Sequence, residues 1–416
     1  MKLRSSMAFA LMCGSLAVTS ASAGTAAYTQ FELQARSNLP VNDAGYNLPP
    51  GSSFNSISAA INDAAAVSFP VQIVPDQTSY HPGIWSGSHG VGALVYEGPS
   101  EASISSDGTL NSSGAIVFTL GDTSGADGLY VYDPVDAAAT RLNTSPVIPN
   151  YYGSPAINAD GIVGYQAVFS SGRALASTGA GSSVFHASDS GIDPDSAYTY
   201  LYTPSFNDLR HIAAKVATSA DQTSQVELRI FASDGSSQRI LANQATDAQS
   251  PYSKFDNSLA LNNADVIAVV ATRASDNRRV VLRSDGVDTI EIASVDPAGT
   301  IRDIEFFAPS INDAGLVVFR AKDAEGQAIY VGDGTRLVRV VGNGDVVATD
   351  LGSAQIGQDN DSDPIFSGRP AINNQGDIAF VAGLYPQGDN QTEWGSGVFV
   401  AYAAANDAVF ADGFDG

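Results

Sequence analysis

The feature that most constrains the fold of this chain is a motif centred on asparagine that recurs seven times. Each copy is a short apolar run ending in Asn, then a turn, then a second apolar run, as in "APSINDAGLVVFRA". Consecutive copies lie 49, 47, 49, 55, 50 and 61 residues apart, and their asparagines are Asn62, Asn111, Asn158, Asn207, Asn262, Asn312 and Asn373. A repeat of this period indicates a chain built from copies of one supersecondary unit.

Each copy predicts four antiparallel strands. In the copy around Asn312, "PSIN" ends the first strand, and Asn-Asp-Ala-Gly forms a hairpin turn in which Asn and Gly tolerate positive φ. The runs "LVVFRA", "GQAIYVGDG" and "TRLVRVVG" supply three more strands, the first of them rich in β-branched and aromatic residues. Four strands in about 50 residues favour a propeller blade over a solenoid coil. A β-sandwich is the main alternative, but it does not explain seven similar copies.

We therefore expect an all-β chain that forms a single seven-bladed β-propeller of four-stranded antiparallel blades. The early segment "QFELQA", residues 30–35, alternates like a strand and is expected to complete the last blade. The propeller is expected to occupy residues 24–411, with 412–416 as a C-terminal tail.

Residues 1–23 are expected to be a signal peptide. Lys2 and Arg4 precede an apolar core, and Ala21-Ser22-Ala23 matches a cleavage signal, so cleavage after Ala23 is predicted. Cys13 lies in this segment, which would leave the mature chain without thiol or disulfide chemistry. A secreted protein, periplasmic or extracellular, is predicted. No other apolar stretch is long enough to predict a membrane span.

The formal net charge of −24 bears on possible partners. A field of this sign disfavours nucleic acid and anionic lipid surfaces. The sequence also lacks a G-x-S-x-G elbow, an H-E-x-x-H helix and a P-loop. We expect a monomer with a polysaccharide or a cell-surface glycan as its partner.

The repeat resembles a known type. The pattern of "SPAINADGIVGYQ" and "RPAINNQGDIAFVA" resembles the tandem NxxGxxxAF repeat proteins of secreted bacterial origin. It is also similar to the blades of TolB-type propellers, which read "SPDG". The resemblance covers all seven copies and implies the propeller fold. Repeats of this kind serve binding, scaffolding and catalysis, so it implies no single activity.

The loops expected on one face of the propeller are rich in Tyr and Arg. By analogy with other propellers, the connections between blades and those between second and third strands share this face. Aromatic rings stack on sugar rings, and Arg pairs with a uronate carboxylate, so this face favours a carbohydrate ligand. These side chains could equally be ordinary loop cover. The residues expected to bind substrate are Tyr200, Tyr252, Arg320, Tyr385 and Trp394.

The same residue types suit β-elimination in a uronate-containing polysaccharide. This chemistry needs a cation to neutralise the carboxylate, and a His or Tyr as base and acid. In blade number and residue types the chain resembles seven-bladed propeller polysaccharide lyases of the ulvan lyase type. An exported lyase is therefore expected, and the alternative is a non-catalytic secreted or cell-surface propeller that binds a glycan or a protein. The expected catalytic residues are His81, Tyr80, Tyr152, Arg173 and Arg369.

One short segment is a candidate metal site. "DNDSD" places Asp359, Asp361 and Asp363 at alternating positions, a spacing that lets a loop wrap a hard cation. Calcium is the expected ion, and a solvated acidic turn is the alternative. The Asn-Asp pairs after the first strands are instead expected to form turns.

Overall fold

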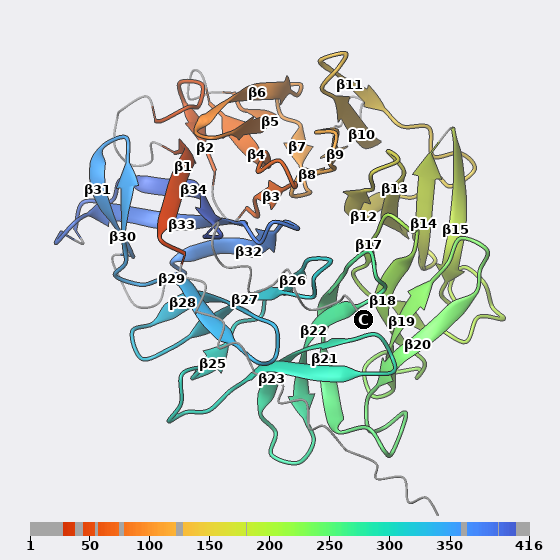
Figure 1. Cartoon of the computed structure of the whole chain (residues 1–416). Helices are drawn as coiled ribbons and strands as arrows, with labels where there is room; N and C mark the ends of the chain where they lie inside the picture. The colour runs from red at the N-terminus through yellow and green to blue at the C-terminus, as the bar shows by residue number, and fades with distance from the viewer. Residues whose placement is uncertain are drawn as a thin grey trace, which may run out of the picture.

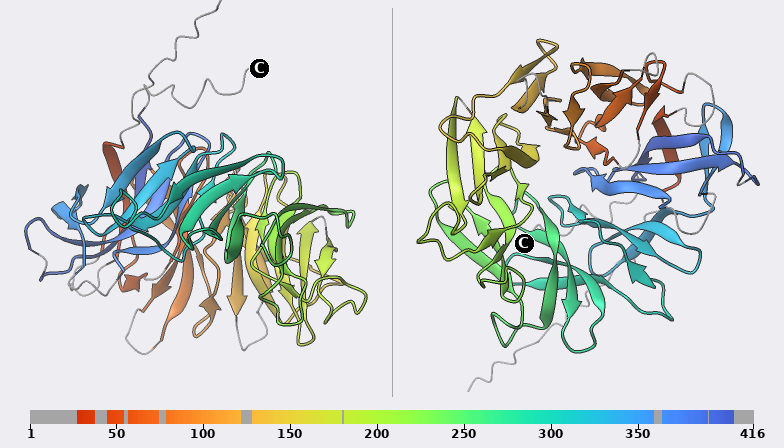
Figure 2. Two further views of the ribbon diagram at one scale, coloured as in Figure 1. Left: turned by 90° about the horizontal axis from the view of Figure 1, so that it is seen from below. Right: turned by 180° about the vertical axis from the view of Figure 1, so that it is seen from behind.

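The computed structural model describes residues 28–37, 45–54, 57–74, 79–121, 128–179, 181–358, 364–389 and 391–404. Within these ranges it contains no helix and 34 strands, in seven antiparallel sheets arranged around one axis (Figure 1). Figure 2 shows the same ring from its side and from behind. The predicted seven-bladed β-propeller is confirmed. The signal peptide and the C-terminal tail lie outside the described residues and stay predictions.

The first four blades follow the chain in order, and each begins with its innermost strand. Blade 1 contains β2 (Ser52–Ser53), β3 (Ala60–Ile61), β4 (Val67–Ile73), β5 (His81–Ser88) and β6 (Val91–Glu97). Blade 2 contains β7 (Ser103–Ile104), β8 (Thr109–Leu110), β9 (Ile116–Gly121), β10 (Gly128–Asp133) and β11 (Ala138–Arg141). Blade 3 contains β12 (Tyr151–Ile157), β13 (Val163–Val168), β14 (Arg173–Gly179) and β15 (Ser182–Ser188). Blade 4 contains β16 (Tyr200–Leu201), β17 (Ser205–Phe206), β18 (Ile212–Ala217), β19 (Val226–Phe231) and β20 (Ser237–Ala242).

The remaining blades follow the same plan. Blade 5 contains β21 (Tyr252–Leu261), β22 (Ile267–Arg273), β23 (Arg279–Ser284) and β24 (Thr289–Ser294). Blade 6 contains β25 (Asp303–Ile304), β26 (Ser310–Ile311), β27 (Val317–Lys322), β28 (Gln327–Gly332) and β29 (Leu337–Gly342). Blade 7 contains β32 (Phe366–Ile372), β33 (Ile378–Pro386), β34 (Gly395–Tyr402) and β1 (Gln30–Arg36).

Strand β1 closes the ring, as the alternation of residues 30–35 predicts. It pairs antiparallel with β34, from Gln30 opposite Tyr402 to Arg36 opposite Gly397. In Figure 1 the red N-terminal strand accordingly lies beside the blue strands from the other end of the chain. Blade 7 is thus assembled from strands far apart in the sequence, which joins the start of the propeller to its last blade within one sheet.

Blade 7 also carries a hairpin that the sequence reasoning missed. Strands β30 (Val346–Thr349) and β31 (Gly352–Ile356) pair with each other, and β31 pairs with the end of β33. The guanidinium of Arg36, which is fully buried, donates to both carboxylate oxygens of Asp350 at 2.9 Å. The hairpin is therefore fastened to the closing strand by a bidentate ion pair.

The core lies between the blades. Second strands such as β18 and β22 are buried on both faces because a neighbouring blade covers each side, and they therefore read as nearly continuous apolar runs. Leu228 of blade 4 and Val269 of blade 5, for example, belong to one buried cluster. Burial of this kind provides most of the stabilisation between blades.

The repeated asparagine connects neighbouring blades at six of the seven boundaries. In blade 5, Asn262 Oδ1 accepts the N–H groups of Ala264 and Val266, which confirms its role as a turn former. Its Nδ2 also donates to the carbonyl of Asn312 in blade 6 at 3.0 Å. The six bonds of this kind run from Asn62 to Asn111, Asn111 to Asn158, Asn207 to Asn262, Asn262 to Asn312, Asn312 to Asn373 and Asn373 to Asn62.

The bond that would join blades 3 and 4 is not formed. Asn158 is only 3% exposed, and its Nδ2 has no hydrogen-bond partner among the described residues. Other contacts span this boundary: the Gln166 side chain donates to the carbonyls of Leu201 and Tyr202. The hydrogen-bonded ring around the axis therefore has one break.

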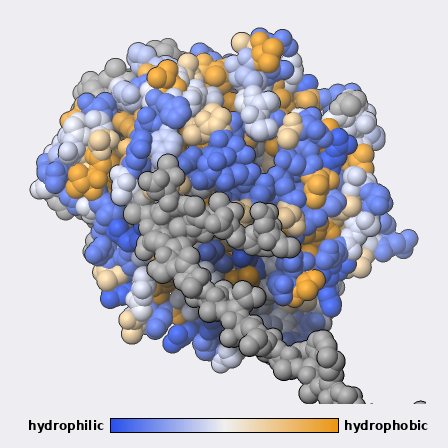
Figure 3. All heavy atoms as spheres, in the orientation of Figure 1, coloured by the Kyte–Doolittle hydropathy of each residue, from blue (hydrophilic) through white to orange (hydrophobic). Residues whose placement is uncertain are grey.

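On the side shown in Figure 3, hydrophilic residues predominate and hydrophobic residues lie in small, separate groups. The most exposed large apolar side chains include Val91, Val135 and Val287, which lie on three different blades. No helix among the described residues has the length and hydropathy needed to cross a bilayer.

Candidate functional site

Every inner strand is interrupted at the same point. In blades 1, 2, 4 and 6 it is split into two short strands, and in blades 3, 5 and 7 the register shifts within one longer strand. Such an irregularity redirects the side chain at that point. In all seven blades the break contains the residue four positions before the repeated Asn. These residues are Ser58, Asp107, Ser154, Thr203, Ser258, Ala308 and Arg369.

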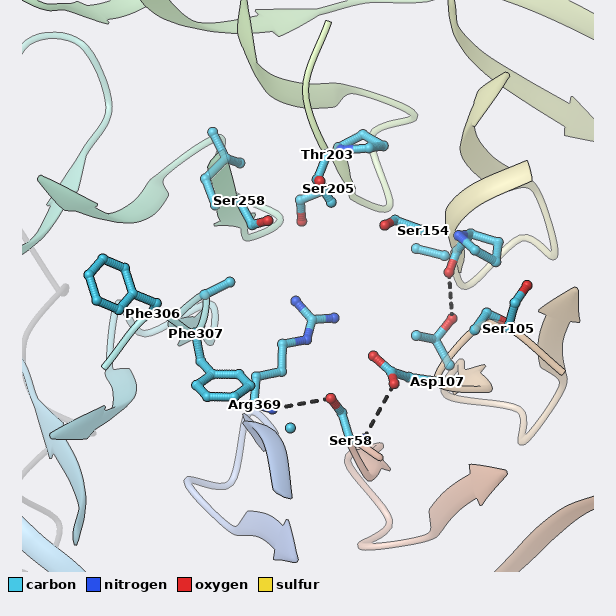
Figure 4. Close-up of a pocket in the computed structure, with 18 of the residues that line it drawn as sticks. Ser58, Ser105, Asp107, Ser154, Thr203, Ser205, Ser258, Phe306, Phe307 and Arg369 are labelled. Atoms are coloured by element: carbon cyan, nitrogen blue, oxygen red, sulfur yellow. Dashed lines mark hydrogen bonds between the residues drawn. The ribbon is translucent and has the colours of Figure 1, made fainter. Parts of the chain in front are cut away.

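All seven of these residues line one pocket of about 400 Å³ (Figure 4). Because every blade contributes one of them, the pocket lies where the inner strands of the blades converge around the propeller axis. We call it the channel-mouth pocket. Its further lining includes Ser105, Ser106, Tyr151, Ser205, Phe306 and Phe307.

The pocket is rich in hydroxyl groups and carries two opposite charges. Four of the seven equivalent residues are Ser or Thr, one is Ala, and the other two are Arg369 of blade 7 and Asp107 of blade 2. Ser58 of blade 1 lies between these two. Its Oγ accepts the backbone N–H of Arg369 at 3.1 Å, and its own N–H donates to Asp107 Oδ1 at 3.3 Å (Figure 4).

The guanidinium of Arg369 extends into the cavity (Figure 4). Among the described residues, no side chain or carbonyl pairs with this guanidinium, and the only bond to Arg369 beyond its strand is the one from its backbone. A guanidinium presents five N–H donors in a planar fork that matches a carboxylate. The predicted site residue Arg369 therefore lies in a position to hold an anion.

Two phenylalanines stand at the rim of the pocket. Phe306 is 81% exposed, and the guanidinium carbon of Arg279 lies 3.9 Å from its ring centroid. Arg320 lies equally close to the ring of Phe307. An exposed aromatic ring held in place from one side offers a flat apolar surface to a ligand.

The sequence analysis expected Arg320 to lie in a surface loop and to bind substrate, and the structure corrects this expectation. Arg320 lies within β27, is 2% exposed, and donates to Glu305 Oε2 at 2.6 Å and to the carbonyl of Gly368 at 2.7 Å. Its donors are taken up inside the protein, because an unpaired buried charge would be strongly unfavourable. It supports Phe307 and links blades 6 and 7.

His81 and Tyr80 lie outside the channel-mouth pocket. His81 is the first residue of β5, and its Nδ1 lies 3.2 Å from the carbonyl oxygen of Gly98 and 3.7 Å from a carboxylate oxygen of Glu97. Tyr80 lines a separate, more apolar pocket between blades 1 and 2. The structure therefore does not bring these two residues together with Arg369.

Tyr152, Arg173 and Tyr200 also lie away from the pocket lining. The Tyr152 ring packs against Tyr165, and its hydroxyl lies 2.8 Å from that of Thr144. The guanidinium carbon of Arg173 stacks 4.1 Å from the ring centroid of Tyr200, so these two contact each other. The neighbouring Tyr151, 46% exposed, is the tyrosine that lines the pocket.

The remaining aromatic candidates are largely covered by the protein. Tyr252 is 4% exposed within the core of blades 4 and 5, where burial raises its pKa to about 12. Tyr385 is buried in β33, and Trp394 packs against the core of blade 7. The expectation that these rings lie on loops is wrong for the two tyrosines, which belong to strands.

Asp359, Asp361 and Asp363 lie outside the described residues, so the calcium site stays a prediction. Within the described residues, no group of three or more His, Cys, Asp and Glu side chains is arranged to hold a metal ion.

The sequence analysis did not compare the position four residues before the repeated Asn across the seven copies, and this comparison would have found the pocket. Aligning the copies on their Asn puts Ser58, Asp107 and Arg369 in one column. Because blades are related by rotation about the channel axis, one column places its side chains around one ring.

Comparisons with known proteins bear on the fold. No family model matches the sequence, and no curated protein matches it. Among solved structures, the β-propeller domain of the Trilobed protease from Pyrococcus furiosus is similar with a TM-score of 0.52 and 10% identity, over 82% of this chain and 97% of that one. That propeller is described as having an open velcro topology, whereas β1 closes the present ring.

Two peptidases are similar at lower scores. Prolyl oligopeptidase B from Galerina marginata has a TM-score of 0.48 and 10% identity, over 83% of this chain and 51% of that one. The acylaminoacyl peptidase from Pyrococcus horikoshii has a TM-score of 0.47 and 11% identity, over 80% of this chain and 49% of that one. At such identities a similarity says nothing of activity. The Trilobed protease propeller supports what the sheets show, namely that this chain is a β-propeller.

Proposed function

We propose that the protein binds an acidic saccharide at the channel-mouth pocket, with Arg369 pairing with the saccharide's carboxylate. The observation that carries this proposal is the unpaired guanidinium of Arg369 in a pocket to which all seven blades contribute. A bidentate Arg–carboxylate pair is among the stronger and more specific hydrogen-bonded contacts in proteins.

The rest of the lining supports a sugar. The hydroxyls of Ser58, Ser154, Thr203 and Ser258 can both donate to and accept from sugar hydroxyls. The exposed ring of Phe306 offers a face for the C–H side of a pyranose. A volume of about 400 Å³ is in the range of small-molecule sites.

The charge of the whole molecule limits the ligand. With a net charge of −24, the protein repels a long polyanion, so we expect a short or sparsely charged chain. Arg369 provides the local positive charge that the molecule as a whole lacks.

The geometry favours binding over the predicted β-elimination. The expected base, His81, does not line the pocket; Tyr151 and Asp107 are the lining residues that could accept a proton. An additional lyase activity is therefore an outcome to be tested.

The test is calorimetric titration with galacturonate trisaccharide and with its neutral galactose counterpart. We expect wild type to prefer the acid by about tenfold to a hundredfold, because a hydrogen bond to a charged group contributes roughly 1.5–3 kcal/mol. Arg369→Ala should abolish this preference, and Arg369→Lys should keep only part of it because an ammonium lacks the planar fork.

Arg210→Ala is the matched control, because Arg210 lies on a different turn in an exposed ion pair with Asp160. Unchanged preference in Arg369→Ala would overturn the proposal. Ultraviolet absorbance of unsaturated uronate, followed in the same samples, would reveal a lyase if it rises with time.

A further inference from the structure

Arg369 and Asp107 are the two charged residues among the seven equivalent residues that line the pocket. They occupy the same repeat position on blades 7 and 2, on either side of Ser58, and both face the cavity (Figure 4). No ion pair joins them. Asp107 Oδ1 accepts the Ser58 N–H, and the other carboxylate oxygen has no partner among the described residues.

The fold does not require an acid at this position. The equivalent residues in blades 3, 4, 5 and 6 are Ser154, Thr203, Ser258 and Ala308, and those blades form the same interrupted inner strand. Asp107 Oδ1 joins blades 1 and 2 through the Ser58 N–H, but the hydroxyl of Ser58 makes the equivalent bond to the Arg369 N–H, so this contact does not require an acid. The second carboxylate oxygen is left over, and it points to a ligand.

An acid beside Arg369 is unfavourable for a simple anion. The negative charge of Asp107 repels an anion that the guanidinium attracts. The pair suits a ligand that brings hydrogen-bond donors to Asp107 as well as a carboxylate to Arg369, because an ionised carboxylate can only accept.

We propose that Asp107 is a specificity-determining residue that accepts hydrogen bonds from the vicinal hydroxyls of the same uronate ring whose carboxylate Arg369 holds. This inference rests on the proposed function and adds to it the part of the sugar that is recognised. Ser58 links the two positions, because its backbone N–H donates to the Asp107 carboxylate and its hydroxyl accepts the Arg369 backbone N–H. The pocket thus holds one acidic sugar by two of its edges.

The experiment compares three probes: methyl galacturonoside, its 2,3-di-O-methyl ether and neutral methyl galactoside. Wild type is expected to bind the free diol at least tenfold more tightly than the ether, because hydrogen bonds to an ionised acceptor are the strong ones. Asp107→Ala should abolish this diol preference. Asp107→Asn, which can still accept the Ser58 N–H, should retain a reduced preference.

Each outcome separates the two proposals. If wild type binds the acid no better than the neutral sugar, the proposed function fails. If wild type prefers the acid but Asp107→Ala keeps the diol preference, or weakens diol and ether equally, only the specificity role of Asp107 is overturned. Asp285→Ala, on an outer turn of blade 5 where the Asp285 carboxylate accepts the N–H groups of Val287 and Asp288 in its own turn, is the matched control.

Discussion

Two positions of the repeat, the Asn and the residue four positions before it, have different structural roles. The Asn is the same in every blade because it forms its own turn and, in six of seven cases, bonds to the next blade. The residue four positions earlier is Ser, Thr, Ala, Asp or Arg, and in every blade it lines the cavity. The fixed position specifies the ring, and under the proposed function the variable one specifies the ligand.

We predict that Asn262→Ala destabilises the protein by roughly 1–3 kcal/mol more than Asn158→Ala does. Both side chains are buried and accept bonds within their own turns, but only Asn262 donates to the next blade. The measurement is the free energy of unfolding in urea for the two variants and wild type. Equal losses would show that the bond between blades contributes nothing to stability.

At the scale of single elements, the boundary between blades 3 and 4 is held by a buried histidine. His186 in β15 is 3% exposed, and its Nδ1 lies 3.4 Å from the Phe231 carbonyl of β19. A carbonyl can only accept, so Nδ1 carries the proton and Nε2 accepts the hydroxyl of Ser177 at 2.9 Å. The bond from Ser177 needs the neutral ring, because a protonated Nε2 cannot accept, and burial lowers the pKa of His186 to about 4.

This makes stability pH-dependent in a defined window. Between about pH 6.5 and 4 the unfolded chain takes up a proton at His186 that the folded chain does not, so stability falls as the pH falls, by up to about 3 kcal/mol. His186→Gln should remove this component. Urea unfolding at pH 7 and 4.5 for both proteins checks it, and an unchanged pH dependence in His186→Gln would contradict it.

The elements also show what sequence could and could not predict. The Asn repeats predict seven blades, and the alternation of residues 30–35 predicts the closing strand, because both are local patterns. Tyr252 and Arg320 were assigned to loops by analogy, but they lie in strands whose neighbours bury them. Whether a side chain is buried between blades depends on the length of the strand that carries it. The sequence of a single repeat does not specify this length. The sequence predicts Arg369 as a site residue. The six equivalent residues that line the pocket with it come from the other blades, and they are found only when the seven copies are aligned.

At the scale of the whole molecule, the ring depends on one strand from its far end. Strand β1 supplies the outer edge of blade 7, and Leu33 and Ala35 are buried there. A propeller without this strand exposes the unpaired edge of β34, which is an aggregation risk.

We predict that a chain beginning at residue 45 unfolds at lower urea concentration and self-associates. A synthetic peptide of residues 28–37 added in trans should restore the monomer and part of the stability, since it can pair with β34. Size-exclusion chromatography and urea unfolding measure both effects. A peptide with Leu33 and Ala35 both changed to Lys is the control and should not rescue, and a truncated chain as stable as the full one would refute the closing role of β1.

The pairing of Gln30 with Tyr402 has a consequence for how the molecule is made. Strand β1 precedes every other described strand in the chain and can pair only after β34, which follows them all, has been synthesised. Contacts that span such a separation form slowly, because the entropy of closing a long loop is lost before the contacts lower the free energy. Until then the edge of the last blade stays open to other chains. The interval between the end of synthesis and the docking of β1 is therefore the time when the protein is most vulnerable to aggregation.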